Sequence, residues 1–145
     1  KDNVKEEEIE PLIDISFNGS IPPSFIDDEK ERFAVYKLIM RANSFEELDK
    51  IRVNLKERYG HITKEVDNLF RISRIKIMAR KLGINQIKQD KNNIKIEVVP
   101  SRNRIEVAKV LEVIKSGKIK VSDNNMILKS STLEDLEEVF NKLYF

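Results

Sequence analysis

The chain has 145 residues, enough for a substantial hydrophobic core, and its 27 Lys and Arg nearly balance its 25 Asp and Glu. A dedicated nucleic-acid-binding domain is expected to be more strongly basic. Cys is absent, which excludes a disulfide framework and a thiolate metal site, and no apolar run approaches the roughly 18 residues that a membrane span needs.

The N-terminal region divides into a polar end and a strand. Residues 1–10 include the run Lys5-Glu6-Glu7-Glu8 and almost no apolar side chain, so they are predicted to be a linker or a disordered end. Apolar and polar residues alternate from Ile13 to Phe17, which predicts a half-buried strand. Residues 11–145 are predicted to form a single domain.

Three helices with short connections are predicted in residues 28–82. On the first helix, Phe33, Tyr36 and Met40 share one face and are predicted to be buried. This face is widened by further apolar residues: Ala34, Leu38 and Ile39. An apolar face of this width indicates a helix that is contacted on two sides.

The second and third helices have marked ends. Ser44 and Glu47 form a capping box, in which the hydroxyl and the carboxylate accept hydrogen bonds from backbone N–H groups. Gly60 is predicted to end the second helix with a positive φ, Thr63 to cap the third and Gly83 to end it. The second helix has one apolar stripe, which is predicted to be buried: Phe45, Leu48, Ile51, Leu55 and Tyr59.

The chain after residue 83 is predicted to contain two β-hairpins. In the first, Ile94, Ile96 and Val98 alternate with polar residues and follow a polar turn at residues 90–93. In the second, the turn at residues 122–125 separates two short apolar strands. Each hairpin is followed by a predicted helix.

The first of these helices is predicted to begin at Pro100 and to end at Gly117. Its apolar residues are predicted to face inward: Ile105, Val107, Ala108, Val110, Leu111 and Ile114. A capping box from Ser131 to Glu134 begins the last helix. The fold class is therefore α+β, with an N-terminal strand and a three-helix subdomain followed by two β-hairpin–helix units.

The sequence contains no catalytic constellation. The four glycines lie at the ends of predicted elements, so none forms a phosphate-binding loop. His61 has no orienting partner nearby in the sequence and is interpreted as a loop residue. Asp27, Asp28 and Glu29 resemble a metal cluster, but their place at a helix N-terminus accounts for them. We expect no enzymatic activity, no cofactor and no metal.

Basic residues crowd the third helix. Arg71, Arg74, Arg80 and Lys81 would clamp phosphates if their side chains converged. The aromatic interleaving of single-strand binders is missing, however, and acids are scattered through the other elements. Salt bridges to these acids, or a solvated face, are the preferred interpretation. A nucleic-acid-binding accessory domain that uses these residues is the alternative function.

Four runs of residues, taken together, carry a family resemblance. Pro23–Lys37 contains a proline, an aromatic-isoleucine pair, acids and then Arg…Tyr-Lys, while Leu55–Gly60 reads Leu-Lys-Glu-Arg-Tyr-Gly. With Glu46–Leu48 and Ala79–Ile84, they resemble the C-terminal domain of the bacterial transcription-repair coupling factor family, whose turn reads Leu-x-Asp-Arg-Phe-Gly. The resemblance extends from Ile13 to about Ile84, and the later hairpins and helices share only the pattern. Two positions depart from the family: Thr63 stands near the position where the family favours proline, and Asn54 occupies a position that is often Glu in the family.

The resemblance implies a non-catalytic module of a large DNA translocase driven by ATP. In that family the translocase displaces stalled RNA polymerase and recruits the excision-repair protein UvrA. The C-terminal domain packs on the UvrB-like N-terminal module of the same polypeptide and masks the UvrA-binding surface. This implies an intramolecular partner, indirect links to UvrA and RNA polymerase, a bacterial cytoplasmic location, no membrane and no direct DNA contact.

The resemblance also nominates a partner interface of Asn54, Glu57 and Arg58. Glu57 matches the acid of the family's Asp-Arg-Phe-Gly turn, and Asn54 lies one turn earlier on the same helix. Glu57 is therefore expected to face the partner, while the uncharged Asn54 is expected to make a weaker contact than the family's Glu. The alternative is that Glu57 pairs with Lys56 or Lys64 on its own surface.

Overall fold

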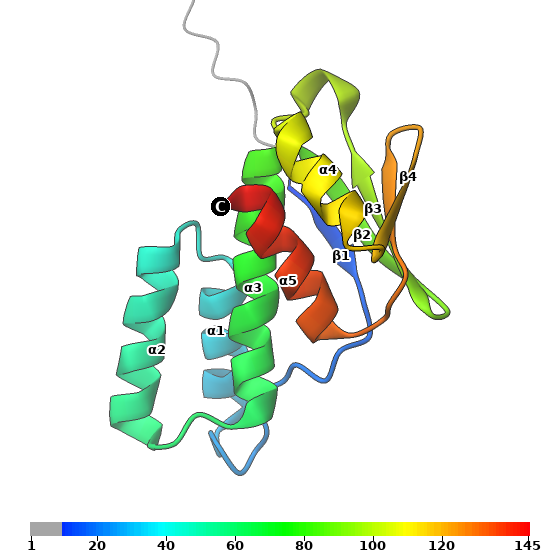
Figure 1. The fold of residues 1–145 in the computed structure, drawn as a ribbon. Helices are drawn as coiled ribbons and strands as arrows, with labels where there is room; N and C mark the ends of the chain where they lie inside the picture. Colours follow the sequence, from blue (N-terminus) through cyan, green and yellow to red (C-terminus); the bar gives the residue numbers. More distant parts are fainter. Residues whose placement is uncertain (1–9) are drawn as a thin grey trace, which may run out of the picture. The chain divides into compact units, whose positions relative to one another are not determined.

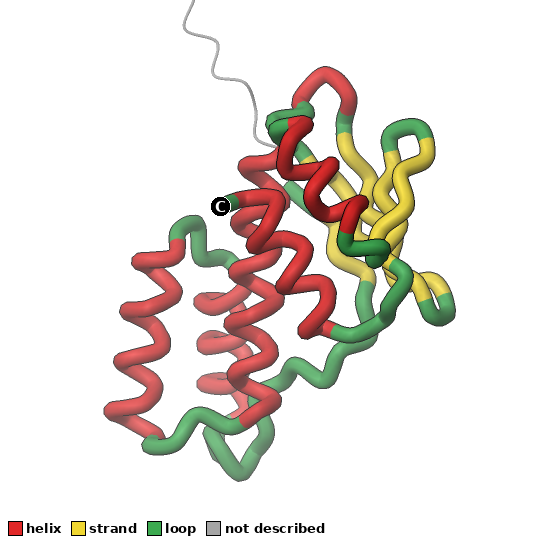
Figure 2. Tube along the Cα trace, viewed as in Figure 1, coloured by secondary structure: helices red, strands yellow, loops and turns green. Residues whose placement is uncertain are grey.

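The structure, a computed structural model, describes residues 10–145 and confirms the α+β class (Figures 1 and 2). Of the predicted linker at residues 1–10, all but Glu10 lies outside the described residues. The elements in chain order are β1 (Leu12–Asp14), α1 (Glu29–Met40), α2 (Phe45–Tyr59), α3 (Lys64–Leu82), β2 (Ile84–Asp90), β3 (Asn93–Val98), the 3₁₀ turn η1 (Pro100–Arg102), α4 (Val107–Lys115), β4 (Ile119–Ser122), β5 (Asn125–Leu128) and α5 (Leu133–Tyr144).

The described chain divides into two compact units. Residues 16–77 form a helical unit, and the described residues up to Ile15 form a sheet unit together with Met78–Phe145. The boundary at residue 77 falls inside the continuous helix α3. The prediction of one domain over residues 11–145 stays a prediction.

Local capping sets the ends of the helices in the helical unit. The hydroxyl of Ser44 accepts from the N–H of Glu47 at 3.1 Å, as predicted. The Glu47 carboxylate accepts from the N–H of Asn43 at 2.9 Å, one residue earlier than a standard capping box. Thr63 caps α3 through a 3.3 Å bond from the N–H of Val66. At the centre of α3, the buried hydroxyl of Ser73 donates to the carbonyl of Ile39 at 2.6 Å, which ties α3 to α1.

The predicted buried face of α1 is wrong in part. Phe33 is 61% exposed and Tyr36 is 41% exposed, whereas the fully buried residues of this helix are Val35 and Ile39. These two residues are four apart and lie one above the other, so they form the contact with the rest of the helical unit. The Lys37 ammonium lies 4.7 Å from the centre of the Phe33 ring and partly covers it. Met40 is half-buried.

Gly60 ends α2 with φ 83° and ψ −134°, a backbone conformation that only glycine adopts readily. A Cβ at this position would meet no atom within 4 Å, so a substitution would suffer from backbone strain alone. We expect Gly60→Val to lower the free energy of unfolding by roughly 1–3 kcal/mol, because a β-branched residue resists positive φ. Coincident thermal melts of wild type and variant would contradict this account of the helix end.

The sheet unit is built on a sheet whose described strands lie in the order β1-β2-β3-β5-β4. β1 runs parallel to β2, and the other neighbouring pairs are antiparallel. Figure 1 shows α4 and α5 on the same side of this sheet. The buried stripe of α5 contains Leu133, Leu136, Val139, Phe140 and Leu143. The two hairpins and the last helix are therefore confirmed, while the first strand is shorter than the predicted Ile13–Phe17.

The helix predicted from Pro100 to Gly117 is broken. Only Pro100–Arg102 forms a 3₁₀ turn, and α4 starts at Val107. The break follows from Asn103, whose side-chain oxygen accepts from the N–H of Ile105 at 2.9 Å and so closes a local turn. The prediction that the apolar residues of this helix face inward is also wrong, since Val107 is 72% exposed and Leu111 is 52% exposed.

The predicted cap of the last helix is displaced by one residue. Thr132, and not Ser131, is the N-cap, because its hydroxyl accepts from the N–H of Asp135 at 3.1 Å. The Asp135 carboxylate in turn accepts from the hydroxyl of Ser130 at 2.5 Å. This hydrogen bond is the main cause that lowers the pKa of Asp135 below its ordinary value.

Candidate partner-binding surface

Helix α2 presents the predicted interface residues on its outer side. Its buried positions are Leu48 and Leu55, and the side chains of Asn54 and Glu57 point away from them and are exposed. Neither exposed side chain is needed to fill the core of the helical unit. Their exposure satisfies the first requirement for contact with a partner.

An apolar groove lies between α1 and α2, next to these residues. It has a volume of about 400 Å³ and is lined by Val35, Leu38, Lys50, Ile51, Asn54, Leu55 and Arg58. We call it the α1–α2 groove. Leu38 is 54% exposed at this groove, although the sequence indicated that it would widen a buried face. Asn54 and Lys50 also line a neighbouring hollow of about 320 Å³, which reaches Glu57.

Arg58 is anchored at the edge of the groove by Glu31 of α1. Its guanidinium lies 3.0 Å from the Glu31 carboxylate, which also accepts the hydroxyl of Tyr59. This hydroxyl bond raises the pKa of Tyr59 above its ordinary value, because the carboxylate stabilises the protonated phenol. The Arg58 side chain remains 61% exposed, so it is positioned by α1 and still accessible.

Glu57 differs from Arg58 in its surroundings. Within the described residues 10–145 its side chain forms no ion pair and no hydrogen bond, and neither Lys56 nor Lys64 pairs with it. The alternative in which Glu57 pairs with one of these lysines is therefore not seen in the structure. Its role toward a partner stays a prediction.

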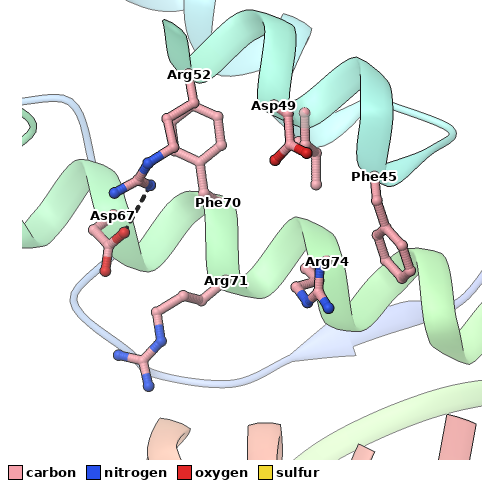
Figure 3. A pocket seen from close by; sticks show the side chains of 8 residues that line it. Phe45, Asp49, Arg52, Asp67, Phe70, Arg71 and Arg74 are labelled. Carbon is pink, nitrogen blue, oxygen red and sulfur yellow. Dashed lines mark hydrogen bonds and ion pairs between the residues drawn. The ribbon is translucent and has the colours of Figure 1, made fainter. Parts of the chain in front are cut away.

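Two members of the predicted basic patch, Arg71 and Arg74, line a separate small pocket of about 140 Å³ between α2 and α3 (Figure 3). Arg52 enters the same pocket from α2 and forms a 2.7 Å ion pair with Asp67. Arg74 lies 4.3 Å from the centre of the Phe45 ring. Mixed charges and aromatic contacts of this kind stabilise the packing of two helices.

The other two members of the patch belong to the sheet unit. Arg80 pairs with Glu10 at 3.1 Å, and its side chain is only 8% exposed, whereas Lys81 is exposed. The preferred interpretation, salt bridges to acids of other elements, therefore holds for Arg80. Sequence reasoning missed Arg52, because its partner Asp67 is 15 residues away and lies on another helix.

Residues 10–145 contain neither a membrane-spanning helix nor a metal cluster. No helix in this part of the chain is long and apolar enough to cross a membrane. The same residues contain no group of three or more His, Cys, Asp or Glu side chains arranged to hold a metal ion, and Asp27 and Asp28 are no exception. Asp28 instead caps α1 through its contact with the N–H of Lys30.

Residues 15–110 match the sequence profile of the TRCF domain family. A transcription-repair-coupling factor of Bacillus subtilis (strain 168) is 31% identical over 97 residues, which are 67% of this chain and 8% of that protein. Its counterpart from Borreliella burgdorferi is 30% identical over 109 residues, which are 75% of this chain and 9% of that protein. The chain thus matches less than a tenth of the length of these relatives.

A solved structure has the same fold. The crystal structure of the C-terminal domain of a transcription-repair coupling factor superposes with a TM-score of 0.80 at 17% identity. The superposition covers 94% of this chain and 92% of the solved chain. The likeness extends beyond the residues of the family profile and includes the second hairpin and the last helix.

Proposed function

The chain belongs to the TRCF domain family, and from this premise we propose that it is an autoinhibitory interaction module. In this proposal it is a non-catalytic part of an ATP-driven DNA translocase. It packs on the UvrB-like N-terminal module of the same polypeptide and masks the surface that binds UvrA. RNA polymerase is linked to it only through the parent protein. The proposal also places the protein in the bacterial cytoplasm.

One observation carries the proposal: an exposed acid without a partner lies close to an apolar groove. Glu57 has no ion pair in the described chain, and the neighbouring α1–α2 groove leaves Leu38 half exposed. Interfaces commonly combine an apolar centre with charged groups that are paired only in the complex. Arg58, held in place by Glu31, adds a donor with little freedom to lose on binding.

In this proposal Asn54 affects the strength of the contact with the N-terminal module. It lines both the α1–α2 groove and the hollow that reaches Glu57, so it lies at the centre of the proposed interface. A carboxylate at this position would pair with a basic side chain of the partner, whereas the neutral amide forms only an ordinary hydrogen bond. The contact that masks the UvrA-binding surface is therefore expected to be weaker than in relatives with Glu at position 54, because charge-assisted hydrogen bonds are stronger.

The groove can be tested in isolation from the acid. Leu38→Asn removes an apolar side chain that is exposed in the free domain, so we expect unfolding to change little. Binding of the 145-residue chain to the separately produced N-terminal module should weaken about tenfold, since burial of a Leu contributes on the order of 1.5–3 kcal/mol. Isothermal titration calorimetry measures this binding.

The matched control for this measurement is Val107→Asn on α4. Val107 is also an exposed aliphatic residue, at 72% exposure, but it belongs to the sheet unit. Val107→Asn should therefore leave the affinity for the N-terminal module unchanged. Equal affinities of wild type and Leu38→Asn would remove the groove from the proposed interface.

The alternative function, binding of nucleic acid by Arg71, Arg74, Arg80 and Lys81, has weaker support. Arg80 is occupied by Glu10, and the pocket of Arg71 and Arg74 includes carboxylates that would repel phosphates. Duplex affinity that falls steeply with rising salt, and that is lost in Arg71→Gln/Arg74→Gln, would favour this alternative.

A further inference from the structure

The sheet has one side that carries a row of lysines. Strand registers place Lys88 opposite Lys95, Lys95 opposite Ile127, and Ile127 opposite Lys120. Facing residues in a sheet point to the same side, so these four side chains form one line across β2, β3, β5 and β4. We call Lys88, Lys95 and Lys120 the lysine row.

The buried residues of the same strands point to the opposite side. Ile87, Ile96 and Met126 occupy the next positions along their strands and are buried. In Figure 1, α4 and α5 lie on one side of the sheet, and no described helix of the sheet unit lies on the other. The lysine row therefore belongs to the open side, and all three of its side chains are exposed.

The fold does not use the charges of this row. In the described part of the chain, none of the three lysine side chains forms a hydrogen bond or an ion pair. Lys88 and Lys95 stand directly opposite each other on antiparallel strands, an arrangement in which like charges destabilise a sheet. An anion placed over the row would remove this repulsion.

The surroundings of the row indicate the type of anion. Ile127, half-buried, lies between Lys95 and Lys120 and offers an apolar contact. Three carboxylates share the open side. Asp14 stands beside Lys88, Asp90 lies two residues beyond Lys88, and Glu97 lies two residues beyond Lys95, where it accepts from the Asn85 amide at 3.0 Å.

These features favour a protein partner over nucleic acid. The three carboxylates interrupt the positive charge that a continuous phosphate backbone needs along its whole length. The strands β2 to β5 contain no aromatic residue on which a base could stack. An acidic segment with a central aliphatic side chain can instead cover Ile127 and place its carboxylates near the lysines on either side.

We propose that the open side of the sheet is a second docking surface, which binds an acidic, aliphatic-centred segment of a protein partner through the lysine row. This surface is built from the sheet unit alone. It goes beyond the proposed masking function, which uses α1 and α2, and either can fail without the other.

The test uses the whole 145-residue chain and a blocked synthetic peptide, Glu-Glu-Leu-Glu-Glu, titrated in an NMR experiment on backbone amides. We expect chemical-shift changes centred on β2, β3, β4 and β5. The triple variant Lys88→Gln/Lys95→Gln/Lys120→Gln should bind the peptide about tenfold more weakly, since several exposed ion pairs of modest strength are lost together. Its melting temperature should not fall, because the repulsion between Lys88 and Lys95 is also removed.

Controls separate this site from a general effect of charge. The variant Lys56→Gln/Lys64→Gln/Lys115→Gln changes the net charge equally at exposed lysines elsewhere and should bind the peptide as wild type does. The peptide Gln-Gln-Leu-Gln-Gln should not bind. Shifts outside β2–β5, equal affinity in the two triple variants, or row-dependent binding of a 20-base-pair duplex in place of the peptide would overturn the proposal.

Discussion

Gly83→Ala is expected to destabilise the protein by at least about 3 kcal/mol, the largest effect of a single methyl group in this chain. Gly83 joins α3 to β2 with φ 83°, and a Cβ there would lie 1.9 Å from the carbonyl oxygen of Arg102 and 2.6 Å from its carbonyl carbon. The Arg102 backbone cannot retreat easily. Two backbone bonds hold the segment in place, from the N–H of Val99 to Gly83 at 2.9 Å and from the N–H of Arg104 to Leu82 at 3.1 Å.

Gly117→Ala is the matched control, since Gly117 also has a positive φ, 77°, but a Cβ there would meet no atom within 4 Å. It should cost only about 1 kcal/mol of backbone strain. For a chain of this length, 1 kcal/mol corresponds to a shift of roughly 2–4 °C in Tm. Equal shifts for the two variants would show that the close approach of Arg102 to Gly83 is wrong.

Phe140→Ala is expected to lower the free energy of unfolding by about 3–5 kcal/mol. The Phe140 side chain is fully buried in the stripe of α5, between Leu136 and Leu143 on successive turns. Removing the ring forfeits its transfer free energy and leaves a cavity that the neighbours fill only in part. Chemical denaturation measures the change through the midpoint at constant slope.

Phe33→Ala provides the control for this variant and tests the corrected face of α1. Since Phe33 is 61% exposed, its truncation should change stability by no more than about 0.5 kcal/mol. A loss as large as that of Phe140→Ala would restore the original prediction of a buried Phe33. If residues 11–145 form one domain, Phe140→Ala should also lower the hydrogen-exchange protection of α2, in the other unit.

Local features of the fold could be predicted from the sequence. Ser44 and Thr63 cap helices as expected, Gly60 has the predicted positive φ, and α3 ends just before Gly83 as predicted, because each of these depends on a few neighbouring residues. The choice of buried face on α1 could not be predicted. Its apolar residues surround much of the helix, and only contacts with other elements select Val35 and Ile39 over Phe33.

The pairing of strands that are distant in the sequence could not be predicted either. The parallel pairing of β1 with β2 and the antiparallel pairing of β3 with β5 each join strands that are far apart in the sequence. At the candidate interface, the exposure of Glu57 follows from the stripe of α2. The adjoining groove does not, because it needs Val35 and Leu38 of α1 to stand across from Ile51.

The most direct test of the masking function is the affinity of the full-length parent protein for UvrA after Glu57→Arg. The substitution reverses the charge of an exposed side chain that has no partner in the described chain, so the domain should stay folded. A basic surface of the N-terminal module would then repel the domain. The domain would leave the UvrA-binding surface uncovered more often, and UvrA should bind more tightly. Glu112→Arg, an equal change on the exposed face of α4, should leave the affinity as it is.

Surface plasmon resonance with immobilised UvrA gives both affinities under identical salt. The account predicts a higher affinity for Glu57→Arg than for wild type, by about tenfold if the lost pair is desolvated in the interface. An affinity of Glu57→Arg equal to that of wild type and of Glu112→Arg, with the domain folded, would contradict the masking function.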